Sequence, residues 1–320
     1  SKFLGLKNNK IYLDDENLDE IIQNIPDAFD EPFADSSQIP TMLIFQKISK
    51  YAKVCVTGDG GDEIFCGYNR YQWFLIWKNL FKNNLFNNDK TKTILTRIIT
   101  GLEKNSYGSK LLNKFSLTSN KTLKFLNIFF QKENIYDSFI KLSFEKNILN
   151  NPQNINQNIL DEIKELRDFD INNYLVNDIL TKVDRSSMFY SVEARSPLLD
   201  LNLYNYVEEL PYQNNISIFT KKKILKQLLK KKIPSRIISK TKKGFAVPIE
   251  NILITKLKND LVDNVDYYLK DERLKMLNSK VITDLINRFF IYNDKKLCYQ
   301  VWSFYVFFKW FKKYEKFITN

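Results

Sequence analysis

The stretch KVCVTGDGGDEIFCGY, residues 53–68, decides the fold that we expect for this chain. Its first part, 53–57, is a short β-branched run that predicts a buried strand. Three glycines follow within four residues, after which the apolar spacing predicts a helix over 62–80. A strand that leads through a glycine turn into a helix is typical of an open parallel α/β sheet, where ligands bind at the carboxyl ends of strands.

The residues before this stretch predict further elements of the same layer. We expect a short strand at 9–14 and a helix near 17–25, whose first turn is acidic. Ser36 or Ser37 would cap a second helix that ends near Tyr51. The apolar side of that second helix carries Leu43, Ile44 and Ile48, with Phe45 at its edge.

Most of the remaining chain carries helical patterns. The stretches concerned are 80–170, 171–200, 221–232 (apolar at Ile224, Leu225, Leu228 and Leu229) and the aromatic 299–314, which predicts a buried helix. We therefore expect residues 1–80 to be the C-terminal part of an α/β layer and residues 81–320 to be a helical extension, together forming one domain.

The amino-acid composition excludes several kinds of catalytic and metal-binding site. Hydrophobic residues make up 44% of the chain and charged residues 27%, which is typical of globular proteins. Histidine is absent, which excludes Ser-His-Asp and Cys-His chemistry and HExxH zinc sites. Three cysteines without a CxxC pair indicate neither a disulfide framework nor a zinc site. Any catalysis must therefore use carboxylates, lysine, tyrosine or a metal such as magnesium.

The chain carries a formal net charge of +12. A basic protein of this kind can bind a nucleic acid, a membrane surface or an anionic small molecule. The alternative is that the charge only reflects a general bias of the composition toward lysine. The lysine face of 221–232 makes a nucleic-acid-binding protein one alternative, although no recognised nucleic-acid motif is present. No stretch of about 18 apolar residues predicts a membrane span, and the first residues lack a signal sequence, so we expect a cytoplasmic protein without a membrane partner.

The glycine turn is the first candidate site. Gly58, Gly60 and Gly61 let the backbone approach a ligand and point amide groups at a phosphate. Three acidic residues on the same turn would repel that phosphate unless a cation lies between them, and Mg²⁺ prefers one or two carboxylates together with phosphate oxygens. The alternative is a tight turn whose acids only cap the next helix.

Two further segments carry charged residues in patterns that could serve a site. In 178–188, Asp178 and Lys182 are spaced for an i,i+4 ion pair, and such residues could hold a loop in place rather than react. The loop 242–248 could deliver the ammonium of Lys242 to a phosphate, or it could be an ordinary solvated basic loop.

Four segments together resemble one family. DEPFADSSQIPT (30–41), TGDGGDEIFCGYNRY (57–71), DILTKVDRSSM with EARSPLLD (178–200) and PSRIISKTKKGFAVP (234–248) are similar to the synthetase domain of glutamine-dependent asparagine synthetases. The resemblance runs over nearly the whole chain. It implies a partial doubly wound parallel sheet of the ATP pyrophosphatase (adenine nucleotide α-hydrolase) type with a large helical extension.

The resemblance also implies a reaction and roles. Aspartate would attack the α-phosphorus of ATP to give β-aspartyl-AMP and pyrophosphate, and ammonia released from glutamine would then displace AMP. By position, Thr57 and Gly58, with Gly60 and Gly61 of the same turn, would contact ATP. Asp59 would act in catalysis and take a proton from ammonia, Asp62 would bind Mg²⁺ and pyrophosphate, and Lys242 would neutralise the phosphates.

The chain departs from the family pattern in several places. It lacks the SGGxDS phosphate loop and the N-terminal glutaminase domain with its cysteine, while Cys66 replaces a usual glycine and Ser196 a usual valine. We therefore expect the C-terminal part of a longer enzyme, which alone neither makes asparagine nor hydrolyses glutamine. A related amidotransferase acting on a carboxylate of a surface sugar or peptide is the alternative, and a homodimer is an open expectation.

Overall fold

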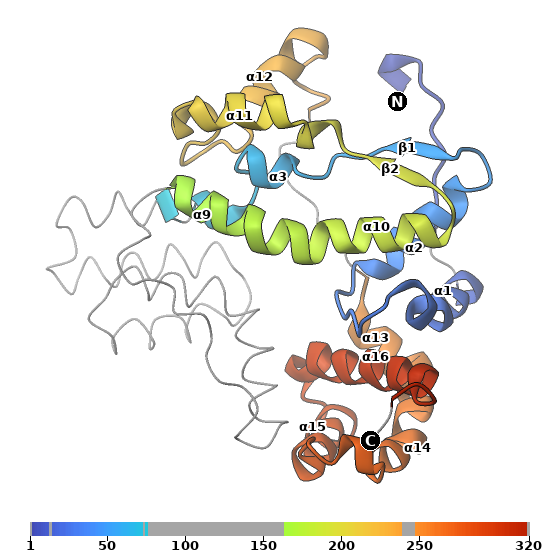
Figure 1. Ribbon diagram of the computed structural model, residues 1–320. Coiled ribbons are helices and arrows are strands. Elements are labelled where there is room, and N and C mark those ends of the chain that lie inside the picture. Colours follow the sequence, from blue (N-terminus) through green and yellow to red (C-terminus); the bar gives the residue numbers. More distant parts are fainter. Residues whose placement is uncertain (1, 13–14, 73, 76–162, 239–246, 319–320) are drawn as a thin grey trace, which may run out of the picture.

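The computed structural model describes most of the chain outside one long central segment (Figure 1). The described residues are 2–12, 15–72, 74–75, 163–238 and 247–318. Most of the helical stretch expected at 80–170 lies outside them, and so does the greater part of the basic loop at 242–248.

Two short strands form a parallel pair. β1 (Val54–Val56) lies beside β2 (Glu193–Arg195), with Cys55 opposite Ala194. The strand at 54–56 forms where the β-branched run predicts it, but the expectation that it is buried is wrong: Val54 and Val56 are 42% and 74% exposed, because β2 is the one strand beside it in the described residues. β2 was not predicted, because its sequence EAR has no apolar run or alternation and two of its three residues are exposed. The protein is thus a helix-rich α/β structure with a small parallel sheet in the described residues.

A long continuous helix crosses the molecule below the sheet (Figure 1). It consists of α9 (Ile163–Phe169), the π-helical segment η3 (Asp170–Leu180) and α10 (Thr181–Phe189). α10 packs on α2 (Gln38–Ile48) and leads directly back into β2. The helix expected to begin near Ser36 or Ser37 is confirmed, but it ends at Ile48 and Ser37 makes no side-chain capping bond.

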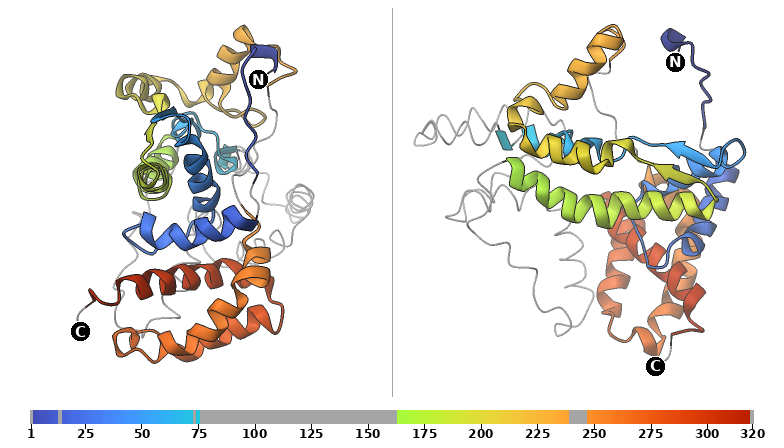
Figure 2. Two further views of the ribbon diagram at one scale, coloured as in Figure 1. Left: turned by 90° about the vertical axis from the view of Figure 1, so that its right-hand side faces the viewer. Right: turned by 45° about the horizontal axis from the view of Figure 1, so that its top comes forward.

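The main hydrophobic core joins the two ends of the described chain. α1 (Asp15–Ala28) and α2 pack against the C-terminal helices, and Figure 2 shows α16 lying along α1. These helices are α13 (Ile249–Ile252), η6 (Leu253–Leu257), α14 (Lys258–Leu269), α15 (Ser279–Phe290) and α16 (Cys298–Tyr314). Trp302, fully buried on α16 as the aromatic pattern predicts, donates its indole N–H to the carbonyl of Ala34 over 2.9 Å.

A smaller group of helices lies on the other side of the long helix, at the top of Figure 1. It comprises α3 (Gly61–Ile64), α11 (Leu201–Glu209) and α12 (Lys223–Lys232). Ile64, Phe65 and Val207 form a second small core there. Short 3₁₀ turns complete the elements: η1 (Lys2–Leu4), η4 (Pro197–Leu199), η5 (Tyr212–Asn214), η7 (Glu272–Leu274) and η8 (Lys295–Leu297).

Two expectations for the N-terminal layer are wrong. Residues 9–12 of the strand expected at 9–14 form no strand and are exposed, and the described part of the chain places no strand beside them with which to pair. The helix expected over 62–80 stops at Ile64 and resumes at 69–72, because Cys66 has a left-handed φ of 52° that breaks the helix. The same φ is a physical reason for the glycine that is usual at this position in the resembling family.

Candidate functional site

The glycine turn begins where both strands of the sheet end. The backbone N–H of Thr57 donates to the carbonyl of Arg195 over 2.8 Å, which extends the pairing by one residue beyond β1. The hydroxyls of Thr57 and Ser196 are 2.5 Å apart, so each strand places a hydroxyl at the same edge of the sheet. The contact also gives a role to Ser196, since a valine at this position could not form it. This edge is where open parallel sheets bind ligands.

The three glycines of the turn serve different purposes. Gly60 has φ +79°, and a Cβ there would overlap the side chain of Leu199. A Cβ on Gly61 would lie 2.8 Å from Cδ1 of Leu198. Gly58 is exposed and has nothing within 4 Å of the position of a Cβ. Gly60 and Gly61 therefore allow the packing of the turn, whereas Gly58 leaves open space through which a ligand could approach the backbone.

The structure separates the three acidic residues of the turn. Asp59 is half-buried; partial burial of the Cys55 thiol, followed by the charge of Asp59, raises the pKa of that thiol. Asp62 is also half-buried and forms an ion pair with Lys222 at 3.1 Å. Glu63 is only 2% exposed and accepts a hydrogen bond from the Tyr68 hydroxyl. Asp59 and Asp62 are thus partly exposed, although Oδ1 of Asp62 is buried, while Glu63 is sealed inside the turn.

The buried side of the turn is a network of charged and aromatic groups. Burial raises the pKa of Glu63 above its usual range, although the hydrogen bond from Tyr68 acts in the opposite direction. Arg70 stacks on the ring of Tyr68, with its guanidinium carbon 4.2 Å from the ring centre, and pairs with both oxygens of Asp170 at 2.8 Å. The hydroxyl of Tyr71 donates to the same carboxylate. These contacts fix the segment that follows the turn on η3.

A second polar cluster joins two of the sequence motifs. The ammonium of Lys182, almost fully buried on α10, lies 2.5 Å from Asp35 and 3.1 Å from Asp178. The i,i+4 pair expected in 178–188 is therefore confirmed, and the contact with Asp35 is one that sequence spacing could not predict. Arg185 pairs with Asp30 at 2.6 Å. The segments 30–41 and 178–188 thus meet through two ion pairs.

The two carboxyls beside Lys182 are affected in opposite directions. Burial alone would raise the pKa of Asp35, but the charge and hydrogen bond of Lys182 outweigh it and lower the pKa. Burial, followed by the charge of Asp35, raises the pKa of Asp178 to about 7. Asp35 therefore loses its proton more readily than an ordinary aspartate, whereas Asp178 loses its proton less readily. This cluster has the loop-holding role that its residue pattern allowed.

The remaining predicted site features are not brought to the turn by the described residues. Lys242 lies outside them. Within the described ranges no group of three His, Cys, Asp or Glu side chains could hold a metal ion, and no helix is long and apolar enough to cross a bilayer.

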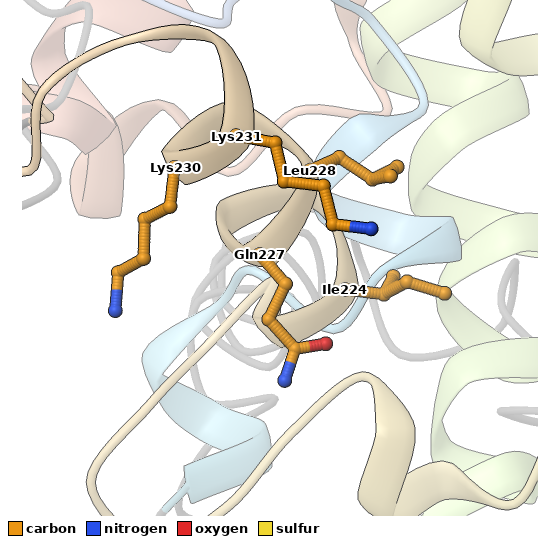
Figure 3. Close-up of a pocket in the computed structure, with 5 residues that line it drawn as sticks. All are labelled: Ile224, Gln227, Leu228, Lys230 and Lys231. Atoms are coloured by element: carbon orange, nitrogen blue, oxygen red, sulfur yellow. The ribbon is translucent and has the colours of Figure 1, made fainter.

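A hollow of about 480 Å³ lies along α12 (Figure 3). Its lining residues are separate from the glycine turn: Ile224, Gln227, Leu228, Lys230 and Lys231.

Comparison with known proteins identifies relatives over the same residues. A family model described as asparagine synthase matches residues 1–312. Asparagine synthetase [glutamine-hydrolyzing] 1 of Bacillus subtilis is 26% identical over 295 residues, which are 86% of this chain and 44% of that protein. A putative asparagine synthetase [glutamine-hydrolyzing] of Mycobacterium bovis is 26% identical over 243 residues, which are 74% of this chain and 36% of that protein. The chain therefore spans less than half the length of these curated relatives.

Proposed function

This chain belongs to the asparagine synthase family, and from that premise we propose that it activates the side-chain carboxylate of aspartate with ATP and converts it to the amide with ammonia from glutamine. The products are asparagine, AMP and pyrophosphate. The observation that carries the proposal is the family match over 1–312, which includes the turn where Thr57, Gly58 and Asp59 lie at the carboxyl end of β1. We also propose that the chain has the doubly wound parallel fold of the ATP pyrophosphatases.

The proposed chemistry has two steps. An oxygen of the aspartate side chain forms a bond with the α-phosphorus of ATP as the bond to pyrophosphate breaks. The nitrogen of ammonia then bonds to the activated carbonyl carbon, and the bond to the AMP oxygen breaks. Asp59, a half-buried carboxylate at the open side of the turn, takes the proton that the nitrogen loses, since the chain has no histidine to do so.

The polyphosphate is assigned to the turn and its neighbours. Thr57 and the backbone at Gly58 contact ATP where a Cβ-free position leaves open space. Mg²⁺ held between phosphates and protein needs only one or two carboxylates, so the donor set fits even though the described residues contain no larger cluster. Asp62 would hold the ion, which when bound neutralises phosphate charge. Lys242 remains proposed as a further phosphate-binding group.

The test uses the protein as its gene encodes it, including any residues beyond this chain. With ATP, Mg²⁺, aspartate and either glutamine or ammonium, we expect AMP and asparagine to form in equal amounts. Asp59→Asn should lower this rate by about 100-fold or more, because the proton acceptor is lost. The matched control is Asp284→Asn, an exposed carboxylate on α15, which should leave the rate unchanged. AMP release with another carboxylate but not with aspartate would contradict the proposed substrate.

A further inference from the structure

The carboxylate of Asp62 has a lysine partner that lies outside the four motifs. Lys222 comes just before α12, and its ammonium lies 3.1 Å from an oxygen of Asp62. The two side chains are 31% and 24% exposed, so the pair is at the surface of the turn and not sealed in the core. A ligand at the turn could therefore reach the Lys222 side chain, whereas the paired oxygen of Asp62, Oδ1, is itself buried.

The backbone at Lys222 is unusual for a lysine. Its φ of 51° is left-handed, a conformation that glycine or asparagine adopts more readily and that is unfavourable for a lysine. The chain nevertheless carries a long cationic side chain there. Strained backbone of this kind is frequent at functional sites.

The turn also leaves room for this lysine. A Cβ on Gly67 would overlap both the Asp62 carboxylate and the side chain of Lys222. A Cβ on Gly61 would lie 3.5 Å from the Lys222 ammonium. The lysine therefore lies beside α3, in space that the missing Cβ of Gly67 leaves free and within ordinary contact distance of Gly61.

The neighbouring lysines have other partners. Lys221 donates to the side-chain oxygen of Asn69, and Lys223 donates to the carbonyl of Gln213 over 3.1 Å. The ion pair of Lys222 with an acidic residue of the turn is the contact on which the inference rests.

We propose that Lys222 is a polyphosphate-binding residue of the candidate site, whose ammonium pairs with Asp62 in this structure and would bind the β- and γ-phosphates of ATP, and pyrophosphate. The inference rests on the proposed function. Its reason is charge: Asp59 and Asp62 lie on the turn at which the phosphates would bind, and a flexible ammonium next to Asp62 offsets their repulsion. An AMP molecule, which has no β-phosphate, would not need this lysine.

The experiment measures binding of ATP, pyrophosphate and AMP, each with Mg²⁺, by calorimetry on the gene-encoded protein. Lys222→Gly suits the left-handed backbone and so removes the side chain without strain. We expect its affinity for ATP and for pyrophosphate to fall about tenfold or more, since a charge-assisted contact is lost, while its affinity for AMP stays the same. Lys222→Gln, which keeps the length without the charge, should behave alike.

Two control variants test separately the two features of Lys222→Gly, which are the change at a left-handed backbone position and the loss of a lysine. Asn293→Gly changes another residue with left-handed φ, at 55°, in the connection between α15 and η8. Lys223→Ala removes the adjacent lysine, whose partner is the Gln213 carbonyl. Both variants should bind all three ligands as the unaltered protein does.

Three results would overturn the inference. Unchanged ATP and pyrophosphate binding in Lys222→Gly would show that the lysine does not touch the phosphates. An equal loss for AMP would show that it only supports the turn. Failure of the unaltered protein to bind ATP and pyrophosphate would remove the proposed function as well, whereas ATP binding without amidation of aspartate would contradict the function alone.

Discussion

At the residue scale, the glycine turn contains two glycines whose substitution should have opposite consequences. Gly60→Ala places a side chain at φ +79° against Leu199, and we expect it to lower the free energy of unfolding by about 2 kcal/mol. Gly58→Ala adds a methyl group in open space, so we expect stability to change by less than about 0.5 kcal/mol.

The two variants should also differ in their affinity for ATP. The methyl of Gly58→Ala would occupy the face that the nucleotide must approach, and we expect ATP affinity to fall about tenfold. Urea denaturation and ATP titration of both variants provide the measurement. A Gly58→Ala protein that binds ATP normally would mean that the nucleotide does not approach at this position.

At the element scale, the ion pairs of Lys182 connect the long helix to the segment that leads into α2. Asp178, whose pKa burial and the charge of Asp35 raise from 3.8 to about 7, is the titrating member of this cluster. Between these two values the folded protein binds more protons at Asp178 than the unfolded chain does. Stability from this group is therefore complete below about pH 4 and is lost as pH rises through about 7.

Asp178→Asn should remove this dependence, because an amide cannot ionise. We expect the free energy of unfolding of the variant, relative to the unaltered protein, to increase from pH 4 to pH 8. Urea denaturation at several pH values measures it. The control is Met188→Ala, an exposed residue of the same helix that cannot ionise, whose difference should stay constant with pH. A constant difference for Asp178→Asn as well would show that the carboxyl ionises normally in the folded protein.

At the scale of the whole molecule, the main core is shared by residues far apart in sequence. Ile21, Ile39 and Met42 of the N-terminal helices are fully buried in the same cluster as Val301 and Trp302 of α16. The division of the chain into 1–80 and 81–320 remains a prediction, and this shared core gives it a direct test.

A version of this chain that stops at Pro248 should lose cooperative unfolding. It would expose the apolar faces of α1 and α2, which pack against the C-terminal helices. Thermal unfolding followed by circular dichroism is the measurement, with the 320-residue chain as the reference. A sharp transition in the shortened chain would show instead that the N-terminal layer folds independently of α13–α16.

Local pattern predicted the elements whose residues carry their own signal. The β-branched run at 54–56 became β1, and the helices at 17–25, 221–232 and 299–314 were confirmed. The local pattern failed where the structure of a segment depends on a second segment of the chain that pairs with it. The residues of β2 have no strand signal and pair because β1 lies beside them, whereas residues 9–12 have strand character but no strand beside them within the described ranges.

The sequence by itself determined the family, the glycine turn and the acidic residues on it, because each depends on residue types at fixed short spacings. Tertiary structure alone decided which acid is sealed by Tyr68, which lysine reaches Asp62, and which of the three glycines is open. The physical reason is that exposure and ion pairing depend on distances between segments far apart in the chain. Lys222 meets Asp62 across 160 residues, and no local pattern encodes that contact.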